Sequence, residues 1–130
     1  MPIAHITLAT RDLARTARFF AETLGWRPIQ RPNNVPYPAA WLAIGPGLEL
    51  HLLELPDFEA SPFEREYGRH IAVSYPPAGF AELKETLRRH GAEVIAADRP
   101  TPFERFFFRD PNGYVFEIVP EGRAAETDVS

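Results

Sequence analysis

The chain has 130 residues, of which 45% are hydrophobic, and this size and composition fit one globular domain with a buried core. Its formal net charge is −4, and its lysine and arginine residues are scattered, which argues against nucleic acid as a partner. The absence of cysteine excludes disulfides, thiolate catalysis and thiolate-bound metals.

No segment of the sequence is apolar for long enough to cross a bilayer, so no membrane partner is expected. The N-terminal residues enter a strand-like run directly and lack the pattern of a secretory signal. We therefore expect a cytoplasmic protein.

In chain order, the first half begins with a β-rich run over Ile3–Leu8 and continues with a helix capped by Asp12. One face of this helix is apolar and Gly25 ends it. The next segments are a strand over Trp26–Gln30, a proline-rich loop over Arg31–Pro38, and a hairpin of Trp41–Ile44 and Leu48–Leu53 around Gly45-Pro46-Gly47.

The second half repeats this order after a charged, proline-containing connection over Leu55–Gly68. A strand over Arg69–Tyr75 precedes a helix with Phe80, Leu83 and Leu87 on one face, which His90-Gly91 ends. The remaining predicted elements are strands near Glu93–Ala96, Glu104–Arg109 and Tyr114–Val119, with a turn at Asp110-Pro111-Asn112-Gly113.

The two halves carry matching residues at a nearly constant offset. His5 matches His70 (70 − 5 = 65), and His51 matches Glu117 (117 − 51 = 66). We therefore predict an α+β fold of two βαβββ modules, over residues 1–54 and 69–120, joined by a linker over 55–68. A polar tail follows over 121–130.

These four matching side chains indicate a metal site. Alternation along a strand turns each of them away from its apolar neighbours, and burying three imidazoles and a carboxylate together requires a compensating cation. His5, His51, His70 and Glu117 would suit one divalent ion: Zn²⁺, Fe²⁺, Ni²⁺, Co²⁺ or Mn²⁺. Two alternatives stay open, since His51 would also serve as a base beside a three-ligand site, and Glu49 is a rival ligand on the same face.

Four further residues are candidates for contact with a substrate. Trp41 and Phe107 occupy matching third strands and would form apolar walls, although either would equally suit a core. Thr7 and Ser74 would orient a bound oxygen or serve only strand pairing. Arg31 and Arg69 are interpreted as solvated surface charges in preference to an anion-binding site. Asp110 is predicted to be a turn residue.

The features that carry a family resemblance are the paired modules, the histidine near the start of each, the acidic residue after DPNGY and the LGW at the helix end. Through these features the sequence resembles the vicinal oxygen chelate superfamily over residues 3–119. The segments RP, AAWL and LHLLE resemble a glyoxalase-like subgroup. The resemblance implies that each module curls into a half-open sheet, together forming a cup. It also implies that the metal ligands lie on the first and fourth strand of each module, at His5, His51, His70 and Glu117.

This resemblance implies a metal-dependent lyase, isomerase or dioxygenase that acts on a small oxygen-chelating substrate, with Glu117 or His51 as the catalytic proton shuttle. A homodimer is also expected. The alternatives are a non-catalytic binding protein of the bleomycin-resistance type and an extradiol-type dioxygenase.

The sequence departs from glyoxalase I at the residues that this resemblance assigns to glutathione and catalysis. His51 replaces one of two glutamates. Ala9, Leu55 and Glu66 stand where the resemblance assigns a glutathione-anchoring arginine, an asparagine and, in some members, a second arginine. True glutathione-dependent glyoxalase activity is therefore not expected.

Overall fold

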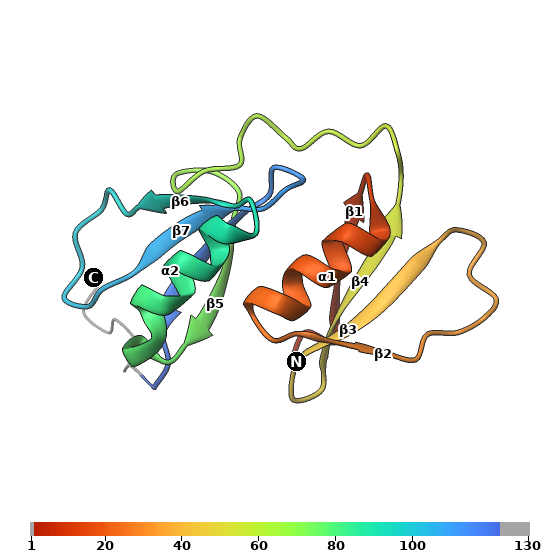
Figure 1. Ribbon diagram of the computed structural model, residues 1–130, viewed down its shortest axis with the longest axis horizontal. Helices are drawn as coiled ribbons and strands as arrows, with labels where there is room; N and C mark the ends of the chain where they lie inside the picture. The colour runs from red at the N-terminus through yellow and green to blue at the C-terminus, as the bar shows by residue number, and fades with distance from the viewer. Residues whose placement is uncertain (1, 123–130) are drawn as a thin grey trace. The chain divides into compact units, whose positions relative to one another are not determined.

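Two structural repeats make up the part of the chain that the computed structural model describes, residues 2–122. The chain divides into two compact units, Met1–Ala60 and Ser61–Ser130. Each unit has one four-stranded mixed sheet and one α-helix of about three turns. Figure 1 shows α1 in the first unit and α2 in the second. The predicted α+β fold of two βαβββ modules is confirmed.

The first unit has the parallel pair β1 and β4 at one edge of its sheet, whose strand order is β1-β4-β3-β2. Its elements are β1 His5–Thr10, α1 Leu13–Thr23, β2 Arg27–Ile29, β3 Ala39–Gly45 and β4 Leu48–Glu54. Asp12 caps α1 as predicted, because its carboxylate accepts the backbone N–H of Arg15 at 3.0 Å. Gly25 follows the helix at φ 75°, the left-handed conformation that glycine adopts most readily.

The second unit repeats the topology, with strand order β5-β8-β7-β6 and a parallel pair of β5 with β8. Its elements are β5 Ile71–Tyr75, the 3₁₀ turn η1 Pro77–Gly79, α2 Phe80–Arg89, β6 Glu93–Ala96, β7 Phe106–Arg109 and β8 Val115–Pro120. Phe80, Leu83 and Leu87 are the buried residues of α2, as the helical spacing predicted.

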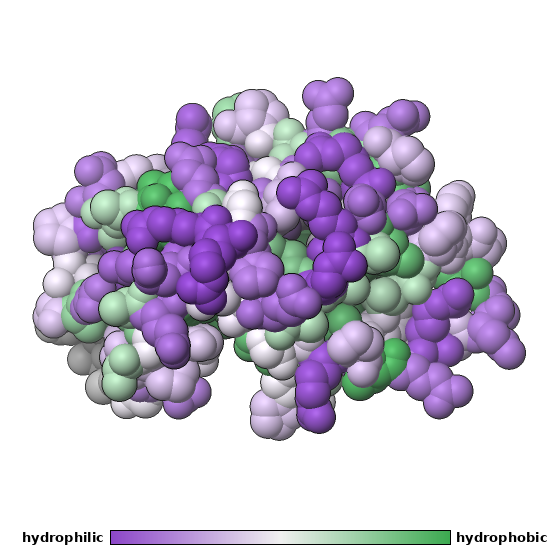
Figure 2. Space-filling view, viewed as in Figure 1, coloured by the Kyte–Doolittle hydropathy of each residue, from purple (hydrophilic) through white to green (hydrophobic). Residues whose placement is uncertain are grey.

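One face of each sheet forms the core of its unit against the helix. In the first unit, α1 contacts β3 and β4, where Leu42 and Leu50 are paired in register and buried. In the second unit, the rings of Phe108 and Phe116 stack at 5.2 Å, and Phe80 meets Phe106 edge to face at 5.4 Å. The exposed sides of both helices carry charged residues, and hydrophilic colouring covers much of them in Figure 2.

Strand register places the predicted site residues on the opposite face of each sheet. Trp41 on β3 pairs with His51 on β4, and Phe107 on β7 pairs with Glu117 on β8. Phe107 follows Trp41 by 66 residues (107 − 41 = 66), and Glu117 follows His51 by the same number (117 − 51 = 66). The sequence repeat is therefore also a repeat of strand register.

Several strand boundaries differ from the prediction, and three of these shifts concern predicted site residues or their neighbours. The first strand begins at His5 instead of Ile3 and extends to Thr10, and β5 begins at Ile71, so that His70 directly precedes its strand. The third shift is at β7, which begins at Phe106. Glu104 and Arg105 thus belong to the loop between β6 and β7.

A buried glutamate, Glu64, anchors the segment predicted as a linker. Glu64 accepts the backbone N–H of Val115 at 2.7 Å and pairs with Arg69. Gly68 is required in this segment, because a Cβ atom there would overlap the carbonyl oxygen of Phe63. The single-domain description and its boundaries remain predictions, and the predicted tail beyond residue 122 lies outside the described residues.

Asp110 occupies the turn between β7 and β8, as predicted, and is buried. Its Oδ1 accepts the backbone N–H groups of Asn112 and Tyr114, each at 2.9 Å, whereas its Oδ2 has no hydrogen-bond partner. Burial raises the pKa of Asp110 from 3.8 to about 6, despite the opposing effect of these hydrogen bonds.

This raised pKa predicts an unusual pH dependence of stability. Between pH 3.8 and 6 the native state keeps the Asp110 proton that the unfolded chain releases, so the free energy of unfolding falls as pH rises. For this one group, the expected decrease between about pH 4.5 and 7 is roughly 2 kcal/mol.

Urea unfolding of the wild type and of Asp110→Asn at both pH values measures this contribution. The difference in the free energy of unfolding between the two proteins should change by roughly 2 kcal/mol between the two pH values, because contributions from the other carboxylates cancel. A difference that stays constant with pH would contradict it.

Of the described residues, none belongs to a helix that is long and apolar enough to span a membrane.

Candidate metal and substrate site

Three aromatic rings are stacked on the sheet of the first unit. The imidazole of His51 lies 4.0 Å from that of His5 and 3.8 Å from the indole of Trp41, measured between ring centroids, and is nearly parallel to both. Since two rings cannot occupy one face at these distances, His51 lies between the other two. Only the edge of its ring remains for polar contacts.

Glu49 occupies one position on that edge. Its Oε1 lies 2.8 Å from His51 Nε2, and the side chain of His51 is only 13% exposed. An ionised carboxylate only accepts hydrogen bonds, so Glu49 favours the tautomer with the proton on Nε2 and the lone pair on Nδ1. Glu49, considered from the sequence as a rival ligand, thus contacts His51 directly.

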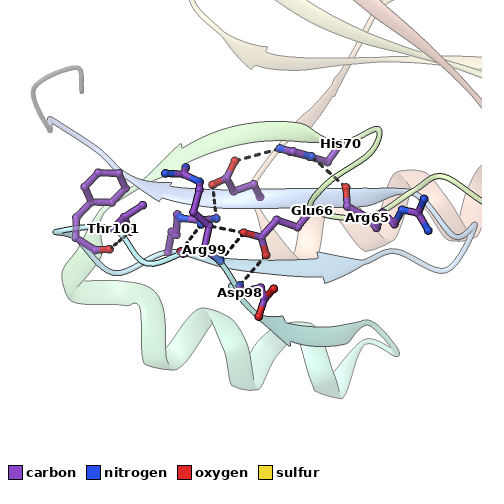
Figure 3. Close-up of polar contacts among 9 residues, drawn as sticks. Arg65, Glu66, His70, Asp98, Arg99 and Thr101 are labelled. Atoms are coloured by element: carbon purple, nitrogen blue, oxygen red, sulfur yellow. Dashed lines mark hydrogen bonds and ion pairs between the residues drawn. The ribbon is translucent and has the colours of Figure 1, made fainter. Parts of the chain in front are cut away.

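His70 and Glu117 form the corresponding pair in the second unit. His70 Nε2 lies 3.3 Å from Glu117 Oε1, and the ring of Phe107 meets that of His70 edge to face at 5.2 Å. On the other side of the ring, His70 Nδ1 lies 3.3 Å from the carbonyl oxygen of Arg65, as Figure 3 shows. A carbonyl oxygen only accepts, so this contact favours a proton on Nδ1, whereas the carboxylate of Glu117 favours a cation at Nε2.

With the proton on Nδ1, His70 presents a lone pair toward the carboxylate of Glu117. Two acceptors that face each other across 3.3 Å repel unless a cation lies between them, either a second proton or a metal ion. His70 and Glu117 therefore fit as two ligands of one divalent ion. Within the described residues, no group of three or more histidine, aspartate or glutamate side chains is gathered for a metal.

A buried guanidinium completes the surroundings of Glu117. Arg105 donates from Nη1 to Glu117 Oε2 at 3.0 Å and from Nη2 to Glu66 Oε2 at 3.0 Å, and its side chain is 2% exposed. Burial alone would lower the pKa of Arg105, but its bond to Glu66 and the charges of both glutamates raise it. Burial likewise opposes ionisation of Glu66, yet its hydrogen bonds to Asp98, Arg99 and Arg105 lower the pKa of Glu66 overall.

The four predicted substrate contacts have different surroundings. Trp41 and Phe107 each lie beside a predicted ligand ring, and Phe107 is buried. Thr7 is exposed and is the register partner of His51, and Ser74 is exposed on β5. Their roles toward a substrate remain predictions.

The two arginines considered as anion sites both have protein partners. Arg31 donates to the carbonyl oxygen of Pro32 at 2.8 Å. Arg69 pairs with Glu64 and lies 5.5 Å from the ring centre of Tyr114. His90, which ends α2, lies with its Nδ1 2.8 Å from the carbonyl oxygen of Thr86, in agreement with the structural role predicted for it.

Arg105, Glu64 and the partners of Glu66 did not emerge from the sequence as site residues. Arg105 follows Glu104 in a charged pair, and such pairs are usually exposed. The apolar run of Phe106 to Phe108 directly after it was the only local signal of a buried environment.

The fold and the paired side chains define a duplicated βαβββ protein, and the chain belongs to the Glyoxalase/Bleomycin resistance protein/Dioxygenase superfamily, whose family model matches residues 2–118. This confirms the resemblance seen in the sequence.

Among individual relatives, the chain is 30% identical to the lactoylglutathione lyase of Salmonella typhimurium over 127 residues, which cover 92% of each protein. It is 29% identical to Glyoxylase I 4 of Arabidopsis thaliana over 120 residues, which cover 88% of this chain and 67% of that protein. Among solved structures, the fosfomycin resistance protein FosX of Listeria monocytogenes, in a complex with Mn(II) and 1S,2S-dihydroxypropylphosphonic acid, matches with a TM-score of 0.75. Its sequence identity is 23%, and the match covers 92% of this chain and 91% of that one.

Proposed function

We propose that the chain is a divalent-metal-dependent enzyme of the glyoxalase-like vicinal oxygen chelate type, which acts on a small organic substrate with adjacent oxygen atoms. The observation that carries the proposal is the 3.3 Å distance between His70 Nε2 and Glu117 Oε1, with the carbonyl oxygen of Arg65 at the other ring nitrogen. With its proton on Nδ1, His70 would offer the Nε2 lone pair to a cation beside Glu117. His5, His51, His70 and Glu117 would hold the ion, which would act as a Lewis acid toward the substrate oxygens.

The protein's own residues supply the proton transfer in this proposal. Glu49 holds Nε2 of His51, which leaves Nδ1 either to bind the metal or to accept a proton as a neutral base. Glu117 would serve as the second proton carrier through Oε1. Trp41 and Phe107 would contact the apolar part of the substrate, and Thr7 and Ser74 its oxygen atoms.

The relatives support metal-dependent chemistry on a small oxygen-bearing ligand, and residues of this chain argue against glutathione-dependent glyoxalase activity. The FosX structure contains Mn(II) and a ligand with neighbouring hydroxyl groups, which is the type of ligand proposed here. Against a glutathione substrate stand Ala9, Leu55 and Glu66 at the anchoring positions. The carboxylate of Glu66 is bound by Arg105 and by two backbone N–H groups of its own chain.

Elemental analysis of protein purified without added metal tests this proposal. We expect one divalent ion per chain, because each chain has one copy of each ligand pair. Iron would favour oxygenation, whereas zinc or nickel would favour Lewis-acid isomerisation or addition. Protein that purifies without metal and takes up none of Zn²⁺, Ni²⁺, Co²⁺, Mn²⁺ or Fe²⁺ stoichiometrically would refute the proposal and favour a non-catalytic binding protein.

A further inference from the structure

Arg105 connects two carboxylates from distant parts of the sequence. Glu117 lies on β8, and Glu66 lies on the connecting segment before β5. The two terminal nitrogens of Arg105 donate in different directions, Nη1 to Glu117 at 3.0 Å and Nη2 to Glu66 at 3.0 Å. Nη2 also donates to the carbonyl oxygen of Arg99 at 2.6 Å. Figure 3 shows this connected set of polar contacts, with Glu66, Arg99 and His70 labelled.

Several contacts besides the two carboxylates fix the position of Arg105. Its guanidinium lies 5.5 Å from the ring centre of Phe107, which itself contacts His70. Glu66 is held in turn by the backbone N–H groups of Asp98 at 2.7 Å and Arg99 at 2.9 Å. A planar guanidinium held at both terminal nitrogens has little freedom to rotate, so it presents Nη1 to Glu117 in one direction.

The two oxygens of Glu117 therefore have different environments. Oε2 accepts from Arg105, and Oε1 faces His70 Nε2. We propose that Arg105 is a positioning residue that holds Oε2, so that Glu117 offers only Oε1 to a metal ion or a proton. This inference rests on the function proposed above and assigns separate roles to the two oxygens of one of its residues.

The anchored oxygen matters for the proton transfer. A carboxylate that binds a metal must release it before it can act as a base. With Oε2 held by Arg105, Glu117 Oε1 can change partners while the carboxylate stays in place. Glu66 binds the far side of the guanidinium and does not contact Glu117 itself, and the carbonyl oxygen of Arg99 and the ring of Phe107 hold Arg105 as well.

A comparison of Arg105→Lys with Glu66→Gln separates this positioning role from simple stabilisation. Lysine retains the positive charge but loses the planar fork, so Glu117 would lose its fixed orientation. Glu66→Gln weakens the other side of the same network while the guanidinium still donates to Glu117. Both variants should lose thermal stability, and only the arginine variant should disturb the site.

The first measurement uses the metal-free protein. Ring nitrogen signals of the histidines, of which the chain has four, can be followed by NMR. We expect the His70 signals to shift in Arg105→Lys and to stay in place in Glu66→Gln. Signals of His5 and His51 should be unchanged in both variants and serve as internal controls.

The second measurement is Zn²⁺ affinity by competition with a chelator. We expect a loss of about 10- to 100-fold in Arg105→Lys, as for other residues that orient a metal ligand, and a change of less than about threefold in Glu66→Gln. If Arg105→Lys does not fold, Arg105→Gln retains N–H donors without the charge and takes its place.

A folded Arg105 variant with unchanged His70 signals would overturn the inference. Failure of the wild type to bind Zn²⁺ would instead count against the proposed function, because the His70 signals test the role of Arg105 without metal.

Discussion

His70→Ala and Glu117→Ala are each expected to abolish stoichiometric metal binding while helix and strand content stays near that of the wild type. Each variant removes one of the two ligands proposed for the second unit, and metal affinity depends steeply on the number of ligands. Neither side chain belongs to the apolar core, which Phe80, Phe106 and Phe108 form with other buried residues. Metal content by elemental analysis and circular dichroism on the same samples measure both effects.

Ser74→Ala is the matched control, because Ser74 lies on β5, the strand that His70 directly precedes, but is not a proposed metal ligand. It should retain the metal. One tightly held ion per chain in both the His70 and the Glu117 variants would refute the assigned site. His51→Ala should weaken binding less if His51 acts as a base.

A mixing experiment extends this prediction to the expected homodimer. One variant combines His5→Ala with His51→Ala, and the other combines His70→Ala with Glu117→Ala. If the two pairs of a site come from different copies, co-refolded mixtures contain heterodimers with one intact site, and metal binding returns. If both pairs come from the same copy, every site in the mixture lacks one pair.

Turnover of the hemithioacetal of methylglyoxal and glutathione is expected to be at least about 100-fold below that of a working glyoxalase. Charge-assisted contacts are each worth roughly 1.5 to 3 kcal/mol, and Ala9 and Leu55 supply none at two anchoring positions. The loss of two such contacts amounts to at least about 3 kcal/mol, or two decades in rate at roughly 1.4 kcal/mol per decade.

The assay follows thioester formation with Zn²⁺, Ni²⁺ and Co²⁺ in turn, beside the lactoylglutathione lyase of Salmonella typhimurium. Ala9→Arg combined with Leu55→Asn restores the side chains that the resemblance assigns to the two positions, and it should recover part of the activity. Efficient turnover by the wild type with any one metal would show that other groups anchor glutathione.

Much of the fold could be predicted because its signals are local. Asp12 and Gly25 mark the ends of α1 by their chemistry, and apolar spacing marks the buried face of α2. The sequence offset paired His51 with Glu117, and the structure shows that both have aromatic register partners on the preceding strand. Repetition made these long-range relations visible in a single sequence.

The network around Glu117 could not be predicted in the same way. Arg105 meets Glu117 across 12 residues and Glu66 across 39 residues of sequence, and no repeat relates these contacts. Glu64 and Glu66 lie in a charged segment whose composition is typical of an exposed linker. Side-chain pairing of this kind depends on the tertiary structure and leaves no periodic pattern.

The stacked arrangement of His51 has a consequence for the entropy of binding. Its ring is held on one face by His5, on the other by Trp41 and at one edge by Glu49, so its side-chain torsions are already restricted in the absence of a ligand. A side chain loses roughly 0.5 to 1.5 kcal/mol of free energy when binding orders it. For His51 this loss occurs when the first unit folds, so it lowers the stability of that unit. It does not lower the affinity of His51 for its ligand.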